Sequence, residues 1–359
     1  MGWRKHVGCW CGNANLSSFS EEYWLCEQCQ TLVLRNWADD QFSVEQDDND
    51  FYGKSYWFKH MEEDLGFGNI LTRSRTDLPE RALHWLRTLL TYKLPPAHTL
   101  ELGCSHGGFV ALLQSSGFVA TGLEVSPWVV RYAHETFGVP VLLGKLEDQQ
   151  LPAASLDVIA LMDVLEHLPD PATTMACCLG LLKPDGILLV QTPRYREGTT
   201  YAQMLERHGP FLEVLKAPEH VHLFSESAVI QFFQRLGAEH IVFEPPVFSR
   251  YDMFLAVSRA PLHTNSPTQI EQHLLTSPGG RLMLALLDKD TQHQDAEQRW
   301  RLADFDRTAR LDQVQQYDAW LKQAQAELKQ TQAELKQTQA ELKRIRQGWA
   351  YKMAKLFRI

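Results

Sequence analysis

The chain lacks long apolar runs, an excess of basic residues and a disulfide-type spread of cysteines. Its 359 residues include 35 Lys and Arg against 44 Asp and Glu, a formal net charge of −9. A general nucleic-acid binder needs clustered Lys and Arg, so this balance argues against that class. No run approaches the ~20 apolar residues that span a bilayer, and the start MGWRKHVGCW lacks a signal-peptide core. We therefore expect a cytoplasmic protein without a nucleic-acid partner.

Four of the seven cysteines lie in two short pairs near the amino terminus. They are Cys9, Cys11, Cys26 and Cys29. Two turns that each present two thiolates suit the tetrahedral coordination of zinc. His6 stands at x-x spacing before Cys9, so either His6 or Cys11 can complete the ligand set. A segment too small for its own core gains folding energy from metal, so we predict a structural zinc module over residues 1–36.

The central stretch 99–126 has the pattern of a strand, a glycine-bearing turn, a helix and a second strand. The turn places Gly103, Gly107 and Gly108 where backbone must come close to a ligand, because a missing Cβ permits close approach. Glu124 closes the second strand, where an acid can accept both hydroxyls of a ribose. The stretch therefore predicts a site for an adenosine-containing ligand.

Two ligand classes use such a unit, and two residues distinguish them. A dinucleotide site prefers G-x-G-x-x-G, but Ser105 occupies the position of the middle glycine that admits a pyrophosphate. An adenosyl-sulfonium cofactor has no phosphate, and Glu101, just before the turn, supplies a negative charge suited to its ammonium. These residues favour methyl transfer.

Apolar strands and amphipathic helices alternate between residues 79 and 258. The expected strands are Thr99–Cys104, Val119–Val125, Val141–Leu146, Leu156–Met162 and Gly186–Thr192. The expected helices are Arg81–Leu90, Phe109–Ser116, Trp128–Phe137, Ala172–Leu182 and Glu226–Leu236. Two further apolar runs, Ile241–Phe243 and Met253–Val257, are close enough to pair antiparallel. The pattern predicts an α/β fold with a doubly wound parallel sheet and one reversed strand.

Four motifs resemble, in order and spacing, those of class I S-adenosylmethionine-dependent methyltransferases. They are ELGCSHGGF, LEVSP, GKLEDQQLPAASLDVIALMDVLEHLPDP and LKPDGILLVQTP, within residues 94–258. The resemblance implies a Rossmann-like sheet of seven strands with a reversed hairpin at one edge. It also implies S-adenosylmethionine along the carboxyl ends of the first strands.

The resemblance assigns site residues by position. It implies that the amino-acid end of the cofactor is lined by Glu101, Gly103, Ser105 and Gly107, and that Glu124 holds the ribose. Lys145 stands where an acid is common at the adenine position, so Leu146 with Glu147 or Asp148 is expected to serve there. Asp163, at the end of the fourth strand, is expected to face the transferring methyl group.

The acceptor must be held about 3 Å from the methyl carbon and deprotonated if it is a hydroxyl. His167 and His220 are candidate bases, because an imidazole titrates near neutral pH. His167 could equally bond backbone at a helix start. The stretch EHVHLFS resembles the EHLSYFS-like segment of sugar methyltransferases, which also begin with a cysteine-pair zinc module. This implies that Glu219 and His220 lie at the acceptor site, although Pro218 replaces the leading His of that segment.

We therefore expect a methyltransferase for a sugar, glycan or other small hydroxylated metabolite, with polysaccharide biosynthesis at the inner membrane face as a setting. One alternative is an NAD-dependent oxidoreductase, which Ser105 and Glu101 disfavour. Another is a catalytically silent methyltransferase-fold scaffold that acts through a coiled coil. The intact run 101–108 with Glu124 argues against this scaffold reading, because these residues are expected to bind the cofactor.

The remaining segments flank the methyltransferase region, 79–258. Residues 37–78 form an acidic linker and an aromatic stretch that either docks a helix or closes as a lid, and residues 259–310 form a helical connector. Over 311–347 a seven-residue repeat, AELKQTQ, predicts a coiled coil that makes a homo-oligomer, or else a solvated helix. The basic amphipathic tail, 348–359, suits either an anionic membrane surface or packing within the oligomer.

Overall fold

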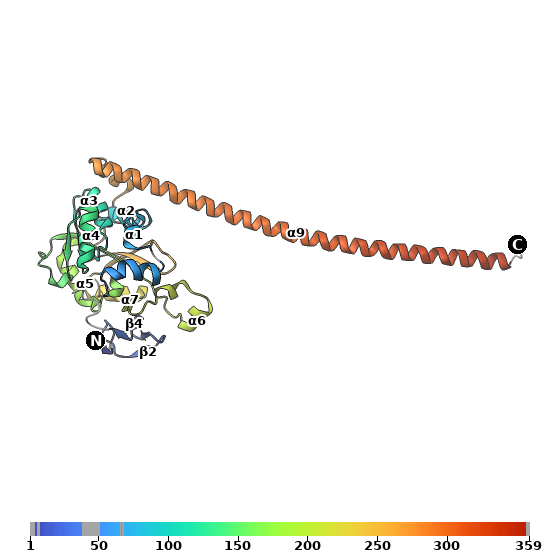
Figure 1. Cartoon of the computed structure of the whole chain (residues 1–359), viewed down its shortest axis with the longest axis horizontal. Helices are drawn as coiled ribbons and strands as arrows, with labels where there is room; N and C mark the ends of the chain where they lie inside the picture. Colours follow the sequence, from blue (N-terminus) through green and yellow to red (C-terminus); the bar gives the residue numbers. More distant parts are fainter. Residues whose placement is uncertain (1–3, 6–7, 38–50, 65, 67, 357–359) are drawn as a thin grey trace. The chain divides into compact units, whose positions relative to one another are not determined.

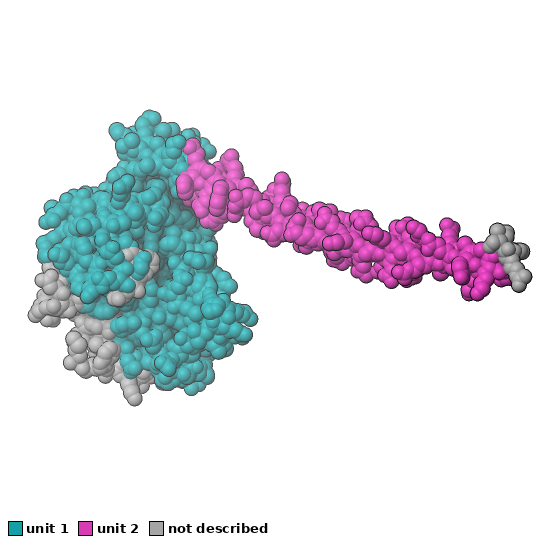
Figure 2. Space-filling view, turned by 45° about the vertical axis from the view of Figure 1, so that its right-hand side comes forward, with its two compact units in different colours: residues 1–290 teal, residues 291–359 magenta. Residues whose placement is uncertain are grey.

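The computed structural model describes residues 4–5, 8–37, 51–64, 66 and 68–356 (Figure 1). His6, the acidic stretch 39–50 and the last three residues of the basic tail lie outside the described residues. The chain divides into two compact units, Met1–Asp290 and Thr291–Ile359, which Figure 2 colours separately.

A seven-stranded sheet forms the centre of the first unit, in the order β12-β13-β10-β9-β6-β7-β8. Its strands are β6 (His98–Leu102), β7 (Val119–Glu124), β8 (Val141–Leu143), β9 (Leu156–Met162), β10 (Leu182–Pro193), β12 (His240–Glu244) and β13 (Asp252–Ser258). β13 runs antiparallel to both of its neighbours, whereas the other pairs are parallel. The predicted doubly wound sheet with a reversed edge hairpin is thus confirmed.

Helices cover both faces of this sheet (Figure 1). They are α2 (Leu83–Tyr92), α3 (Gly108–Ser115), α4 (Pro127–Phe137), α5 (Pro171–Leu181), α7 (Glu226–Arg235) and α8 (Pro267–Leu274). The central strand β9 is apolar at successive positions because its alternate side chains enter two different cores. Val158 and Ala160 pack with α2 and α3, whereas Ile159 and Leu161 pack with α5 and α7.

The cysteine-containing segment forms a second sheet, in the order β11-β4-β3-β2. Its strands are β2 (Leu16–Ser18), β3 (Tyr23–Cys26), β4 (Leu32–Leu34) and β11 (His222–Leu223); β1 (Arg4–Lys5) pairs separately with β5 (Asn36–Trp37). Because β11 comes from the methyltransferase region and pairs with β4, the segment is joined to that region by backbone hydrogen bonds. The separate small module expected from sequence is therefore part of a shared sheet.

Short helices connect the longer elements of the first unit. They are η1 (Tyr56–Asp64), α1 (Ile70–Asp77), η2 (Leu78–Ala82), η3 (Leu146–Asp148), η4 (Leu165–His167), α6 (Tyr201–Glu206) and η5 (Pro210–Val214). In the aromatic stretch, Trp57 packs with Ile70 and Val129, which is the docking role weighed above. Tyr52 and Tyr56 reach the site described below.

A single helix, α9 (Pro278–Leu356), contains most of the expected connector and the predicted coiled coil. Its first turns belong to the first unit, where Met283 and Leu287 are buried in the core with α2 and α8. Its remaining length makes up most of the second unit, where nearly all side chains are exposed. Among the described residues, no helix combines the length and hydropathy needed to cross a membrane.

The start of α9 allows a matched test of packing. Leu287 is 5% exposed and its neighbour Leu286 is 44% exposed. We expect Leu287→Ala to lower the free energy of unfolding by about 2 to 5 kcal/mol, because it leaves a cavity. Leu286→Ala should cost about 0.5 kcal/mol or less. Urea unfolding of the two full-length variants measures both values, and equal losses would contradict this packing.

Candidate active site

The loop after β6 is tied to the end of β7 by the carboxylate of Glu124. Its Oε1 accepts hydrogen bonds from the backbone amides of Val125 (2.8 Å) and Ser126 (3.1 Å), and its Oε2 accepts one from Ser105 N (3.1 Å). Burial raises the pKa of Glu124, and these amide hydrogen bonds oppose the rise. The carboxylate is thus held in place, with lone pairs left for a ligand hydroxyl.

Two positions of this loop need glycine for different structural reasons. Gly103 has φ +70°, and a Cβ there would lie 2.6 Å from Val164 Cγ2. Gly107 has φ +78°, and a Cβ there would lie 2.9 Å from Val139 Cγ2. Gly103 lines the site, but Gly107 is not among the lining residues of either cavity. The structure therefore gives Gly107 a packing contact with Val139, and its place at the amino-acid end of the cofactor stays a prediction.

Two adjoining cavities lie at the carboxyl edge of the sheet. The first has a volume of about 620 Å³ and the second about 450 Å³. Both are lined by Tyr56, Trp57, Gly103, Asp163 and His167. The first also contains Glu101, Ser105 and His220, whereas the second contains Glu124, Leu146 and Glu147. Apart from Gly107, the predicted cofactor residues and bases are thus brought together.

Glu101 presents a buried carboxylate oxygen to the first cavity. Its Oε2 is without a hydrogen-bond partner in the part of the chain that the structure describes. Burial raises the pKa of Glu101 well above its ordinary value, and the charge of Glu124 adds to the rise. A buried unpaired carboxylate is costly, so a cationic ligand group beside it would be stabilised. Glu101 therefore fits the ammonium of S-adenosylmethionine.

The other end of the cofactor region is built on η3. Leu146 is buried, and the carboxylate of Glu147 accepts a hydrogen bond from the Thr174 hydroxyl on α5. Gly144 and Lys145 line the same second cavity. This apolar floor with nearby backbone fits the flat, polar-edged adenine that the resemblance places here.

Asp163 stands where the two cavities meet. Its backbone φ is +58°, in the left-handed region that non-glycine residues rarely adopt. The side chain accepts hydrogen bonds from Gln191 Nε2 (3.1 Å) and Arg81 Nη1 (3.3 Å). Such strain persists only where surrounding bonds hold it, and it is common at functional sites.

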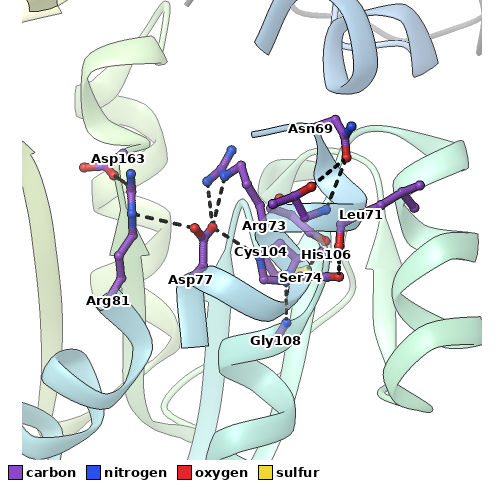
Figure 3. Close-up of polar contacts among 12 residues, drawn as sticks. Asn69, Leu71, Arg73, Ser74, Asp77, Arg81, Cys104, His106, Gly108 and Asp163 are labelled. Atoms are coloured by element: carbon purple, nitrogen blue, oxygen red, sulfur yellow. Dashed lines mark hydrogen bonds and ion pairs between the residues drawn. The ribbon is translucent and has the colours of Figure 1, made fainter. Parts of the chain in front are cut away.

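A polar network that sequence reasoning missed supports this position from α1 and η2 (Figure 3). Asp77 accepts hydrogen bonds from Arg73 Nε (3.1 Å) and His106 Nε2 (3.3 Å), and Arg81 lies between Asp77 and Asp163. Burial opposes ionisation, but the His106 hydrogen bond and the two guanidinium groups hold the pKa of Asp77 at about 2. The network joins the segment before α2 to the glycine loop.

Both candidate imidazoles have one nitrogen bonded to a backbone carbonyl. His167 Nδ1 lies 3.0 Å from Glu219 O, and His220 Nδ1 lies 2.7 Å from Val214 O. A carbonyl only accepts, so Nδ1 carries the proton in each ring and Nε2 keeps a lone pair. Burial lowers the pKa of His167, and burial with the neighbouring His167 lowers that of His220 well below its ordinary value.

The aromatic stretch reaches these imidazoles through Glu219. Its carboxylate lies 2.6 Å from His60 Nε2 and accepts a hydrogen bond from the Tyr56 hydroxyl at 3.1 Å. The Tyr52 hydroxyl lies 3.2 Å from His167 Nδ1. The available sequence signal was the four-residue spacing of Tyr52, Tyr56 and His60, which predicts one helix face, although in the structure Tyr52 precedes η1.

The far wall of the first cavity carries two buried polar atoms without hydrogen-bond partners among the described residues, Asp252 Oδ2 and Arg81 Nε. Burial, followed by the charge of Asp163, raises the pKa of Asp252 to about 8. Phe248 and Tyr251 stack beside them, with ring centroids 5.7 Å apart. This wall offers hydrogen-bonding groups and an aromatic surface to an uncharged polar ligand.

The four cysteines predicted to bind zinc converge. The Sγ atoms of Cys9, Cys11, Cys26 and Cys29 all lie within 4.8 Å of one another. Two of these separations, Cys9 to Cys29 and Cys11 to Cys26, are 3.5 and 3.6 Å, close to the ~3.8 Å edge of a tetrahedron with 2.3 Å Zn–S bonds. The donor set and its spacing fit zinc.

The cysteine segment also contacts the segment that carries Glu219 and His220. The buried Tyr23 hydroxyl donates a hydrogen bond to the backbone carbonyl of His220 (2.9 Å). Arg235 Nη1 donates to the Cys11 carbonyl (2.9 Å) and lies over the Trp10 ring. The sheet that the cysteines anchor therefore positions the segment that carries Glu219 and His220.

Comparison with known proteins identifies one region of the chain. Residues 74–241 match a family model described as a methyltransferase domain. A ubiquinone biosynthesis O-methyltransferase of Xanthomonas campestris is 30% identical over 128 residues, which are 32% of this chain and 54% of the relative. A probable S-adenosylmethionine-dependent methyltransferase of Mycolicibacterium smegmatis is 31% identical over 105 residues, 29% of this chain and 41% of the relative. The match thus spans about half the length of these relatives or less.

A solved structure from Thermotoga maritima, a possible histamine N-methyltransferase, is also similar, with a TM-score of 0.40 and 19% identity over 57% of this chain and 99% of that one. The family match over residues 74–241 coincides with the predicted motifs and with the glycine loop, Glu124 and Asp163. Residues 74–241 are therefore identified as a class I S-adenosylmethionine-dependent methyltransferase domain.

Proposed function

We propose that the protein transfers a methyl group from S-adenosylmethionine to a hydroxyl of a sugar, glycan or other small hydroxylated metabolite. The observation that carries this proposal is the meeting of the two cavities at Gly103, Asp163 and His167. One cavity has the residues that fit an adenosine, and the other has neutral imidazoles and unpartnered polar atoms.

On the donor side, this chain's residues bind and orient. Glu124 would accept the ribose hydroxyls, Glu101 would face the ammonium, and Leu146 with Glu147 would hold the adenine edge. When bound, S-adenosylmethionine supplies an electrophilic methyl group on a good leaving group. Asp163, held by Gln191 and Arg81, would face the reacting end of that site.

On the acceptor side, His220 or His167 would take the hydroxyl proton on Nε2. Each ring is oriented by its Nδ1 bond to a carbonyl, and Tyr23 in turn braces the backbone of His220. The Asp252 carboxyl would hydrogen-bond a further acceptor hydroxyl, and the Phe248–Tyr251 pair would support a sugar ring. The EHVHLFS resemblance and the O-methyltransferase names of the relatives support a hydroxylated acceptor.

An activity screen tests the proposal. The full-length protein would be incubated with methyl-labelled S-adenosylmethionine and panels of nucleotide sugars, lipid-linked glycans and small phenols. Label transfer to a sugar hydroxyl is the expected result. Transfer only to phenols would contradict the proposed sugar acceptor. Tight NAD binding without S-adenosylmethionine binding would contradict the proposed methyl donor.

We also propose that the four thiolates bind one structural zinc ion. Cys26 Sγ lies 3.5 Å from Asn13 Nδ2, and Cys29 Sγ lies 3.2 Å from Thr31 Oγ1, which are donors suited to thiolate ligands. The metal would stabilise the sheet that supports His220, rather than take part in the reaction.

Cofactor affinity tests the two buried carboxylates. Glu101→Gln and Glu124→Gln should each weaken S-adenosylmethionine binding by about 1 to 3 kcal/mol, or roughly 5- to 150-fold, because a charged buried hydrogen-bonding group is lost. Isothermal titration calorimetry measures this. Glu135→Gln, on the exposed face of α4, is the matched control and should bind normally. Unchanged affinity in both site variants would refute the assignment.

The pH dependence tests the imidazoles. Their pKa values lie below the ordinary 6.5, so both rings stay neutral as the pH falls to that value. Methylation of an acceptor found in the screen should therefore hold from pH 8 to about 6.5 and decline only below it. His220→Gln should lower the rate by about 10² to 10⁴-fold if His220 is the base, whereas exposed His134→Gln should not. A methylation rate that already declines above pH 6.5 as the solution is acidified would contradict this assignment.

Metal analysis tests the cysteine cluster. The purified protein should contain one zinc per chain, and Cys29→Ser should lower both the metal content and the thermal midpoint, since metal binding contributes folding energy. Cys177→Ser, a partly exposed thiol on α5, is the control and should retain the zinc. A metal-free wild-type protein whose stability is unaffected by chelator would rule the site out.

A further inference from the structure

The distal part of α9 carries an unbroken apolar row that the methyltransferase region does not use. Every seventh residue from 314 to 356 is apolar, and these side chains are 50% to 78% exposed. The row consists of Val314, Leu321, Leu328, Leu335, Leu342, Trp349 and Leu356. So much regularly spaced apolar surface indicates a partner.

The spacing of the row indicates which kind of partner. A seven-residue repeat drifts by about 20° per repeat on a straight helix, so six repeats rotate the row by about 120°. A flat membrane would contact only part of such a row. A second helix that supercoils with the first keeps the whole row at the contact, and another copy of this chain supplies an identical row.

A second row lies three residues after each member of the first, and the two rows together would form the contact surface, or seam, between paired helices. This second row is more suitable for burial than its composition indicates. It consists of Tyr317, Ala324, Thr331, Thr338 and Ile345. The Thr331 hydroxyl donates to Glu327 O and the Thr338 hydroxyl to Glu334 O, each at 2.9 Å. Because the helix backbone satisfies both hydroxyls, burying these threonines leaves no unpaired polar group.

We propose that two copies of this chain pair through residues 314–345 of α9 as a parallel, in-register coiled coil. With the leucine row at position a, three glutamates, Glu327, Glu334 and Glu341, occupy position g. In a parallel pair they meet the e positions of the second copy, which hold Gln332, Gln339 and Arg346. An antiparallel pair would bring the glutamate rows of the two copies together, which is repulsive.

The same rows limit the number of chains and the length of the seam. Coils of three or four helices bury more of the e and g positions, which would desolvate the glutamates. Beyond Ile345 the next position of the second row is Lys352, and Gly348 interrupts the stretch between them. The seam therefore ends before the basic residues of the tail.

The mass of the full-length protein tests the pairing. Sedimentation equilibrium should give twice the 41.2 kDa chain mass. Leu328→Glu with Leu335→Glu should give a single-chain mass, whereas the matched pair Ala326→Glu with Ala333→Glu, at the outer f position, should stay dimeric. A single-chain mass for the unaltered protein, or a mass of three or more chains, would overturn the proposal.

Cysteine cross-linking tests the orientation. Leu321→Cys lies near one end of the seam, so the two introduced thiols meet only in a parallel, in-register pair. Oxidation should cross-link this variant, and neither Ala326→Cys nor the unaltered protein should cross-link. No cross-link in a dimeric Leu321→Cys protein would overturn the parallel arrangement.

Vesicle binding separates the pairing from a lipid role of the same face. The Leu328→Glu, Leu335→Glu variant and its control, Ala326→Glu with Ala333→Glu, would be floated with phosphatidylglycerol vesicles. We expect the same bound fraction for both proteins, whether that fraction is large or zero. If the leucine variant alone loses vesicle binding while the unaltered protein is a single chain, the row faces lipid and the proposal is wrong.

Discussion

The Glu124 carboxylate, with its three backbone amide hydrogen bonds, is the constraint on which the site depends. Gly103 and Ser105 both have positive φ, which glycine adopts readily but serine rarely does, so Ser105 must be held in this conformation by its surroundings. The bond from Ser105 N to Glu124 anchors the loop to the end of β7. Because of this anchor, Glu101, Gly103 and Asp163 line one continuous space at the edge of the sheet.

The proposed donor and acceptor halves of the site depend on different parts of the fold. The donor half is built on consecutive strand ends of one sheet, so it follows directly from the order β9-β6-β7. The acceptor half is assembled by contacts between distant segments, namely Tyr23 with His220, Tyr56 with Glu219, and Arg81 with Asp163. The cysteine segment therefore contributes to the site by bracing it.

The sequence predicted best where function follows from local pattern. The glycine turn, the acid at the end of the second strand and the spacing of the cysteines each depend on a few adjacent residues, and the structure brings those residues together. Gly107 shows the limit of this reasoning, because a glycine needed for packing against Val139 has the same local signal as one needed for a ligand. The His60–Glu219 contact joins residues 159 positions apart, and no local pattern indicates it.

By itself, the sequence determined the class of fold and predicted the S-adenosylmethionine cofactor and the residues around it, because strand–turn–helix periodicity and turn chemistry are local properties. It also determined the heptad rows of α9. Only the tertiary structure decided how the first cavity is built and supported: that β11 pairs with β4, that Asp77 joins the loop through His106, and that Asp252 and Arg81 face one cavity. These arrangements depend on burial and on hydrogen bonds across the chain, which are settled only when distant segments pack together.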